Sequence, residues 1–387
     1  MTTPLSQDEI AILSSNHTLR QAKDNSRIKI CNRVLDIDIR FDNFVWSKVD
    51  FENCDFINCS MYHGMLQDVQ FLNCLFFSNT WRHGTWENVL FKDCAWKGPF
   101  NMGAPKGVGT VSFLDCEFVG ATEEELGYGG KAETFGSIGG TNGNVNYQHC
   151  GFKRVYINGG SATIFDRCEM LDVVIFGKNG SSIFFNKLTA AGLVDVSNGR
   201  FSSVRIADSE FKGRLTFNDT HIEKALFENV KVNLDLTLVK ANSVEVKGVT
   251  FVGAESPKST LQYGLTCELA KLEQLAVIDC RFQGYGARFH LSGEEPPHQI
   301  HEGNDPKLAS AYSTTVDRLF IRNTPIDDGS FEYMNIGQFV LENLVLGNAN
   351  FSNSSIQNFV TRNVRQSGQL KLENTKIVRK ESDLQLQ

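Results

Sequence analysis

The chain has no run of about 18 apolar residues, so the sequence predicts no membrane span. Its first residues lack a basic segment followed by a long apolar stretch, and we therefore expect no conventional signal peptide. Methionine (6) and proline (8) are scarce, whereas phenylalanine (29) and glycine (33) are abundant. This composition favours short strands joined by tight turns over helices.

Several sequence motifs typical of catalytic or ligand-binding sites are also absent. The sequence contains no Cys-x-x-Cys pair and no Gly-x-Ser-x-Gly motif. The glycine-rich stretch 99–145 has no Gly-Lys-Ser/Thr, which favours an exposed loop over a phosphate-binding loop. The formal net charge is −7, which argues against direct nucleic-acid binding through a basic stripe. Ten cysteines without an export signal indicate reduced thiols, in the cytoplasm or after delivery by a specialised secretion system.

What the sequence does contain is a period of five. Within residues 39–98, the third residue of every block of five is large and apolar. These centres are Phe41, Trp46, Phe51, Phe56, Met61, Leu66, Phe71, Phe76, Trp81, Trp86, Phe91 and Trp96. A period of five fits neither a helix nor a flat strand. It predicts a square solenoid with coils of about twenty residues, stacked about 4.8 Å apart.

The same register returns at residues 314–358, where all nine centres from Val316 to Ile356 are apolar. Between the two regions the same pattern occurs in short segments, such as Phe113 to Phe118 and Val277 to Phe282. A second period of twenty predicts that Phe51, Phe71 and Phe91 stack in adjacent coils. Internal repetition of this kind is typical of a solenoid.

Two blocks carry a resemblance to a known family: Ala349-Asn350-Phe351-Ser352-Asn353 and Cys54-Asp55-Phe56-Ile57-Asn58. They resemble the repeat of the pentapeptide repeat proteins, Ala–Asp/Asn–Leu/Phe followed by two polar residues. The resemblance implies an all-β fold: a right-handed quadrilateral parallel β-helix, with a short N-terminal helical cap and loop or helix insertions.

We therefore expect an N-terminal cap over 1–38, a single solenoid domain over 39–378 and a frayed tail over 379–387. Insertions are expected near 99–110, 120–145, 252–275 and 285–313. Ser6 and Glu9 form a capping-box pattern that predicts a helix over about 7–23. Leu265, Leu269 and Leu272 have helical spacing, which predicts a short helix within 258–274.

Two sets of residues invite a metal-binding or redox interpretation. Cys54, Cys74, Cys94, Cys116, Cys150 and Cys168 share one phase of the repeat, and we expect them to pack in the core as small hydrophobic residues. His63 and His83, twenty residues apart, should lie about 5 Å apart on one outer edge. We see no third ligand for a metal beside them. The sequence predicts no metal and no cofactor.

A candidate partner-binding loop lies in the 285–313 insertion. His-x-x-His beside carboxylates can bind zinc or support acid–base chemistry, and an exposed loop of this composition can also contact a partner. We interpret this insertion as a loop that contacts a partner. The candidate residues are Arg288, His290, Glu294, Glu295, His298, His301, Glu302 and Asp305.

The sequence favours a non-enzymatic protein-interaction scaffold with a partner of unknown identity, such as a bacterial regulator, an immunity or protection protein, or a secreted effector. A rigid repeat surface suits binding. The family resemblance implies one alternative, a DNA-mimicking protein that binds gyrase or topoisomerase IV. A second alternative is a parallel β-helix enzyme acting on polysaccharides. A homodimer through the solenoid ends is a further hypothesis.

Overall fold

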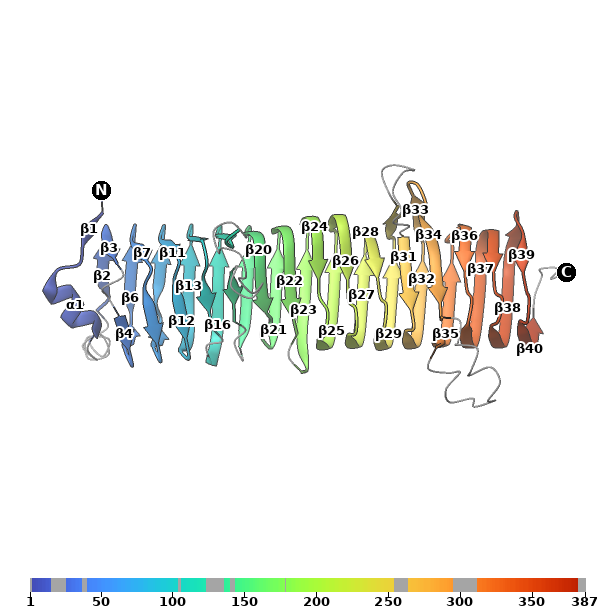
Figure 1. Ribbon diagram of the computed structural model, residues 1–387, viewed down its shortest axis with the longest axis horizontal. Coiled ribbons are helices and arrows are strands. Elements are labelled where there is room, and N and C mark those ends of the chain that lie inside the picture. The colour runs from blue at the N-terminus through green and yellow to red at the C-terminus, as the bar shows by residue number, and fades with distance from the viewer. Residues whose placement is uncertain are drawn as a thin grey trace. The chain divides into compact units, whose positions relative to one another are not determined.

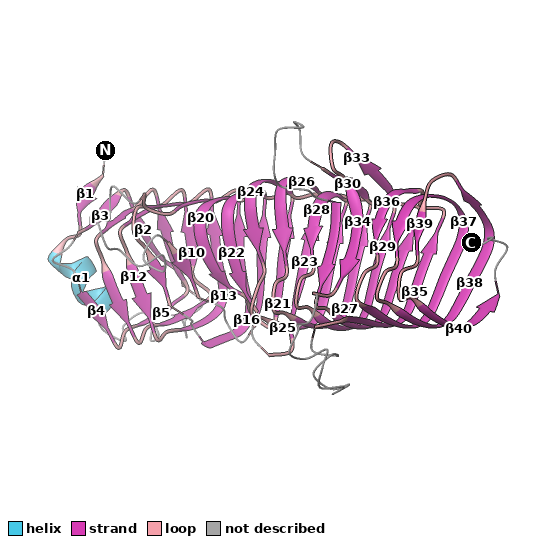
Figure 2. Ribbon diagram, turned by 45° about the vertical axis from the view of Figure 1, so that its right-hand side comes forward, coloured by secondary structure: helices cyan, strands magenta, loops and turns pink. Residues whose placement is uncertain are grey.

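The computed structural model describes residues 2–14, 26–36, 40–103, 106–122, 136–139, 143–177, 179–253, 264–294 and 312–381. The chain divides into two compact units, Met1–Val194 and Asp195–Gln387. In each unit parallel strands stack along the chain (Figure 1), and Figure 2 shows that strands dominate both. Each unit is therefore a parallel β-solenoid. The single domain expected over 39–378 stays a prediction. No helix in these ranges is long and apolar enough to span a membrane.

In the first unit, four five-residue sides make one coil. Strand β6 (Val49–Glu52) pairs in parallel with β10 (Gln70–Leu72), and β10 pairs with β13 (Thr85–Lys92). This register joins Phe51 to Phe71 and Phe71 to Phe91, as the period of twenty predicts. The other strands of these coils are β4 (Arg40–Asp42), β5 (Val45–Ser47), β7 (Asp55–Ile57), β8 (Ser60–Tyr62), β9 (Met65–Gln67), β11 (Leu75–Phe77), β12 (Thr80–Arg82) and β14 (Ala95–Lys97).

The core of this unit is a set of stacked rings. All the predicted centres from Phe41 to Trp96 are at most 4% exposed. The ring of Phe71 lies 5.0 Å from that of Phe51 and 4.7 Å from that of Phe91, with ring planes 5° apart in both pairs. Aromatic pairs contribute about 0.5–1.5 kcal/mol beyond the area that they bury. The abundance of phenylalanine therefore reflects inward positions filled by rings that stack from one coil to the next.

In residues 39–98 the fifth residue of each block forms a corner with a positive φ. Asn53 has φ 54°, Asn73 has φ 52° and Gly98 has φ 75°. Asparagine, aspartate and glycine tolerate this left-handed conformation better than other residues do. Asn73 Nδ2 also donates a hydrogen bond to Asn53 Oδ1 at 2.7 Å, one coil away. The backbone conformation thus explains why the fifth position is polar.

The second unit keeps the same register in longer strands. The nine predicted centres from Val316 to Ile356 are at most 2% exposed. One half of each coil is formed by β25 (Arg200–Ala207), β27 (His221–Glu228), β29 (Lys240–Lys247), β32 (Lys271–Ile278), β35 (Thr314–Arg322), β37 (Met334–Asn350), β38 (Ser355–Gln366) and β40 (Lys376–Glu381). The other half contains β26 (Glu210–Thr216), β28 (Lys231–Asp235), β30 (Thr250–Val252), β31 (Gly264–Glu268), β33 (Arg281–Gln283), β34 (Arg288–Ser292), β36 (Ile326–Ser330) and β39 (Leu370–Lys371).

The N-terminal helix is α1 (Gln7–Ser14), which confirms the first part of the helix expected over 7–23. Residues 15–23 lie outside the described residues. The capping box is reciprocal: the Ser6 amide donates to Glu9 Oε2 at 2.8 Å, and the Glu9 amide donates to Ser6 Oγ at 3.2 Å. Trp46 Nε1 donates to the Leu13 carbonyl at 2.9 Å, so the helix covers the buried edge of the first coils.

Several predicted boundaries are wrong. Strands β2 (Ile28–Cys31) and β3 (Arg33–Leu35) already pair with β6 and β7, so solenoid rungs begin inside the expected cap 1–38. The expected insertion 99–110 holds strands β15 (Asn101–Met102) and β16 (Lys106–Leu114). Two one-residue shifts of register absorb its extra length, one between the pairs Phe77–Lys97 and Thr80–Asn101 and one between Glu87 and Val89. The expected tail from 379 is paired to β38 as far as Glu381, because strand pairing tolerates polar side chains that face outward.

The other three insertions are narrower than expected. The 120–145 region contains the rung β18 (Ser137–Ile138), and the 285–313 region contains β34. The helix predicted within 258–274 is wrong, because residues 264–268 and 271–278 form the strands β31 and β32. Leu265 and Leu272 point into the core, whereas Leu269 is a corner with φ 51°. The step of seven residues from Leu265 to Leu272 makes two turns of a helix. It also makes about one and a half of the five-residue sides of the solenoid, so the leucine spacing fits both structures.

Candidate functional site

Three of the eight candidate residues lie within the described part of the chain. Arg288 and His290 are on β34, and Glu294 follows its end. Glu295, His298, His301, Glu302 and Asp305 lie outside the described residues. Gly293 precedes Glu294, and a Cβ there would lie 2.2 Å from the Tyr312 carbonyl oxygen. Only glycine lets the chain leave β34 at this point.

His290 is the centre of this cluster. Its Nε2 atom lies 2.9 Å from Glu268 Oε1 and 2.9 Å from Ser292 Oγ. The side chain is 18% exposed, and its Nδ1 atom is buried with no hydrogen-bond partner among the described residues. The hydrogen bond to His290 lowers the pKa of Glu268, and the charges of Arg214 and Arg288 add to this against the opposing effect of burial. A carboxylate therefore sits beside the imidazole.

Serine, histidine and glutamate meet here, but not as a catalytic triad. A triad places the serine and the acid on opposite ring nitrogens of the histidine, so that one nitrogen takes the proton while the other is held. Ser292 and Glu268 both contact Nε2 of His290. Ser292 is also only 6% exposed. The arrangement fixes the orientation of His290 and does not activate Ser292.

His290 opens onto a groove with a volume of about 450 Å³. Four rungs build it, because His290 of β34 is in register with Ser330 of β36, Ser330 with Asn350 of β37, and Asn350 with Lys371 of β39. Its lining is polar and carries both signs of charge. The lining residues are Arg288, His290, Asp328, Gly329, Ser330, Glu332, Asn348, Ala349, Asn350, Gln369 and Lys371.

Internal hydrogen bonds hold this lining in place. Ser330 Oγ donates to Glu332 Oε2 at 3.1 Å, and the Gln369 amide donates to Asn348 Oδ1 at 3.0 Å. Gly329 and Ala349 are buried at positions where the repeat requires a small residue, since a Cβ at Gly329 would lie 2.8 Å from the Phe331 ring in the core. Arrayed amides, carboxylates and cations on a fixed backbone suit the recognition of polar groups on a partner.

Sequence reasoning missed most of this groove. Glu268 was assigned to a helix, and Ser330, Glu332, Asn350 and Lys371 were assigned to regular coils with no role. The signal that could have found them is the period of about twenty, since 330, 350 and 371 fall at one phase of the repeat. The register partner of His290 is Ser330, forty residues further on, so the period alone does not join His290 to this set.

The paired histidines lie where the sequence predicts. The rings of His63 and His83 stack with centroids 5.2 Å apart and planes at 16°. Both residues are corners, with φ 53° and 59°. No group of three or more His, Cys, Asp or Glu that could hold a metal ion occurs within the described ranges.

The cysteines pack in the core as expected. All ten are free, and Cys31 alone is not fully buried. Cys74 Sγ lies 3.4 Å from the Leu72 carbonyl oxygen and 3.6 Å from that of Phe51, and the others of the stack make equivalent contacts. Burial raises the pKa of Cys280 to about 11. These thiols are small core residues that bond to corner carbonyls.

The fold defines the class of protein: a β-solenoid of the pentapeptide-repeat type, with buried centres every five residues and rungs about twenty residues apart. No family model matches the chain, and no curated protein matches it. Among solved structures it is similar to HetL, a pentapeptide repeat protein involved in heterocyst differentiation regulation from the cyanobacterium Nostoc sp. strain PCC 7120. The identity is 8% and the TM-score 0.26, over 65% of this chain and all of HetL.

Proposed function

We propose that the chain is a non-enzymatic protein-interaction scaffold and that the groove of the second unit, with Arg288, His290 and Glu294, is its partner-binding surface. The observation that carries this proposal is the polar lining arrayed on four rungs in fixed register. Because the backbone is paired and the side chains bond to one another, binding orders little that is not already ordered. The partner is a protein whose surface offers both signs of charge.

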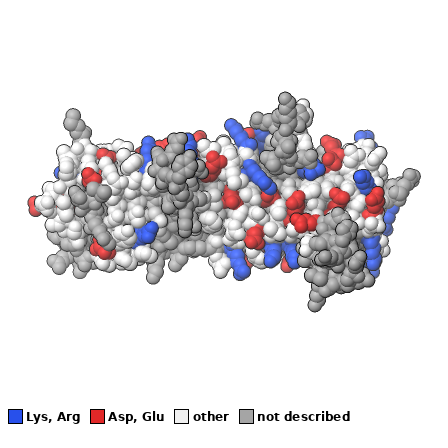
Figure 3. Space-filling model, viewed as in Figure 1, with Lys and Arg blue, Asp and Glu red and all other residues white. Residues whose placement is uncertain are grey.

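The DNA-mimicking alternative needs a continuous acidic face. Figure 3 shows basic and acidic side chains mixed on the visible face of the second unit. This mixture supports a partner whose surface carries both signs of charge over the basic, DNA-binding surface of gyrase or topoisomerase IV. The polysaccharide-acting enzyme needs two carboxylates facing a bound sugar. The groove carries Asp328 and Glu332, and Glu332 already accepts the Ser330 hydroxyl.

The test is a capture experiment with matched variants. The tagged full chain, Arg288→Glu and Lys371→Glu are each incubated with lysate of the source cells, and His63→Ala serves as the control on the first unit. We expect one protein that the wild type and His63→Ala retain and that both groove variants lose. Its direct binding to the purified chain is then measured by calorimetry.

Two results would contradict this proposal, the first for the groove and the second for the scaffold role. One is a captured protein that both groove variants retain, which places the surface elsewhere. The other is the absence of any direct protein partner together with release of reducing ends from polysaccharides, which would establish the enzyme alternative. Cytoplasmic localisation and a bacterial regulatory or effector role stay predictions.

A further inference from the structure

A column of basic residues runs along one face of the second unit, away from the groove. Arg200, His221, Lys240 and Lys271 occupy the same position on β25, β27, β29 and β32, and the register joins each to the next. All four side chains are exposed. Adjacent rungs lie about 4.8 Å apart, so these basic side chains follow one another at that interval.

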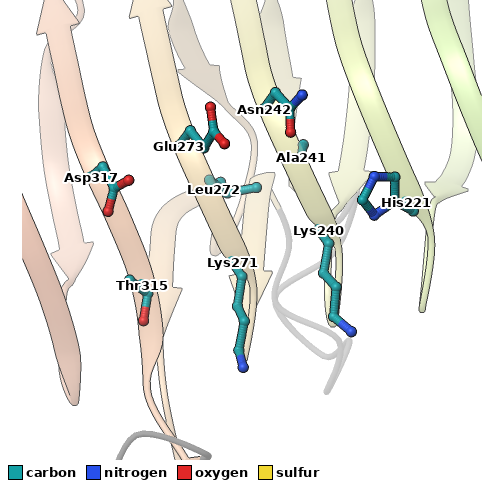
Figure 4. A pocket seen from close by; sticks show the side chains of 9 residues that line it. All are labelled: His221, Lys240, Ala241, Asn242, Lys271, Leu272, Glu273, Thr315 and Asp317. Atoms are coloured by element: carbon teal, nitrogen blue, oxygen red, sulfur yellow. The ribbon is translucent and has the colours of Figure 1, made fainter.

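An acidic column lies beside the basic one. Glu223, Glu273 and Asp317 stand two residues further along β27, β32 and β35, with Asn242 between them on β29. Figure 4 shows Lys240 and Lys271 extending side by side, away from Glu273 and Asp317. No ion pair joins the two columns within the described residues. A hollow of about 360 Å³ lies along them, lined by His221, Lys240, Asn242, Lys271, Glu273 and Asp317 among others.

Like charges lie on neighbouring strands at two places in the isolated chain, Lys240 beside Lys271 and Glu273 beside Asp317. Two like charges about 5 Å apart repel by roughly 1 kcal/mol even in water, and like charges directly opposite in neighbouring strands destabilise a sheet. An opposite charge brought to each column from outside would remove this repulsion. The face therefore favours a partner that carries two columns of its own, with the signs exchanged.

The spacing identifies that partner. It must repeat at the rung interval, and its basic column must meet the acidic column of this chain. A single linear polyanion would satisfy the basic column and be repelled by the acidic one. A second copy of this chain satisfies both, if a two-fold axis runs along the stacking direction over the central residues Ala241 and Leu272, midway between the columns.

We propose that this face pairs with the same face of a second copy in a side-by-side dimer. Lys271 of each copy then faces Glu273 of the other, His221 faces Glu223, and Lys240 faces Asn242. The two-fold axis reverses the direction of the strands but keeps the direction in which the coils stack. The basic column of each copy therefore faces the acidic column of the other. The groove at His290 stays open, since none of its lining residues belongs to either column.

The test measures the mass of the full chain in solution by light scattering, at low salt and over a range of protein concentrations. We expect twice the mass of the 43.2 kDa chain. Lys271→Glu and Glu273→Lys should each weaken dimerisation by at least about tenfold, because each places like charges in contact twice per dimer. The double variant, Lys271→Glu with Glu273→Lys, should restore it, because exchanged columns remain complementary. Lys212→Glu, an exposed change on β26, should leave the dimer intact.

Salt provides an independent measurement on the unchanged chain. Raising the ionic strength from about 0.1 M to 1 M shortens the screening length from about 10 Å to 3 Å, so the dimer should dissociate. A monomeric wild type at low salt would overturn the proposal. So would single variants that dimerise as the wild type does, which indicates pairing through another surface such as the solenoid ends. A double variant that folds, by circular dichroism, but stays monomeric would overturn the two-fold arrangement.

Discussion

Phe71→Ala should be among the most destabilising substitutions in the first unit. Its side chain is 0% exposed and stacks between Phe51 at 5.0 Å and Phe91 at 4.7 Å. Its ring also lies 5.6 Å from the rings of Phe76 and Trp81. Phe→Ala in a core costs about 3–5 kcal/mol, from lost transfer energy and the cavity left behind. The rungs above and below are fixed by backbone pairing and cannot collapse into that cavity, so we expect a cost of about 4–5 kcal/mol.

The matched control is Phe77→Ala, six residues further along and 44% exposed. The same atoms are removed there, but from a side chain that faces solvent, and we expect a cost under about 1 kcal/mol. Both variants are measured by chemical denaturation, followed by far-ultraviolet circular dichroism and tryptophan fluorescence. Equal costs for the two variants, or a cost under about 1 kcal/mol for Phe71→Ala, would refute the assignment of inward and outward positions.

Three further outcomes are expected. Asn73→Val should cost about 1–3 kcal/mol in chemical denaturation, because a β-branched residue is strained at φ 52° and the bond to Asn53 is lost; Asn73→Gly should cost clearly less, and equal costs would contradict a conformational origin. Alkylation of the native chain at pH 8 should modify Cys31 first and leave the nine buried thiols until unfolding, so mass spectrometry should find the early label absent from Cys31→Ser. Glu268→Gln should lower the free energy of unfolding at neutral pH by under about 1 kcal/mol, since the carboxylate is 43% exposed. Because the folded pKa of Glu268 is lowered, its contribution is present above the unfolded pKa of about 4.3 and disappears as the pH falls through the folded value; a difference from wild type that does not shrink as the solution is acidified would contradict this.

The predictable and unpredictable parts of the molecule differ in how far apart the contacting residues lie in the sequence. Phe41 to Trp96 could be placed inside because each block repeats the last, so one register fixes all of them. The three leucines at 265, 269 and 272 fit both periods, so the sequence predicts a helix where the structure has β31 and β32, and only parallel pairing with β28 and β29 separates the two. The groove needed the structure for a similar reason, since Glu268 and His290 belong to rungs separated by irregular chain.

By itself, the sequence determined the repeat, the buried centres, the corner residues and the stacking of Phe51, Phe71 and Phe91, because in a solenoid each of these follows from local spacing. Only the tertiary structure decided where the interrupted rungs resume, and therefore which side chains share a surface. Glu268, His290 and Ser330 meet because strand pairing sets their register across insertions whose lengths carry no periodic signal. The same holds for the charged columns: Lys240 and Lys271 become neighbours only when the hydrogen bonds of the sheet bring their strands together.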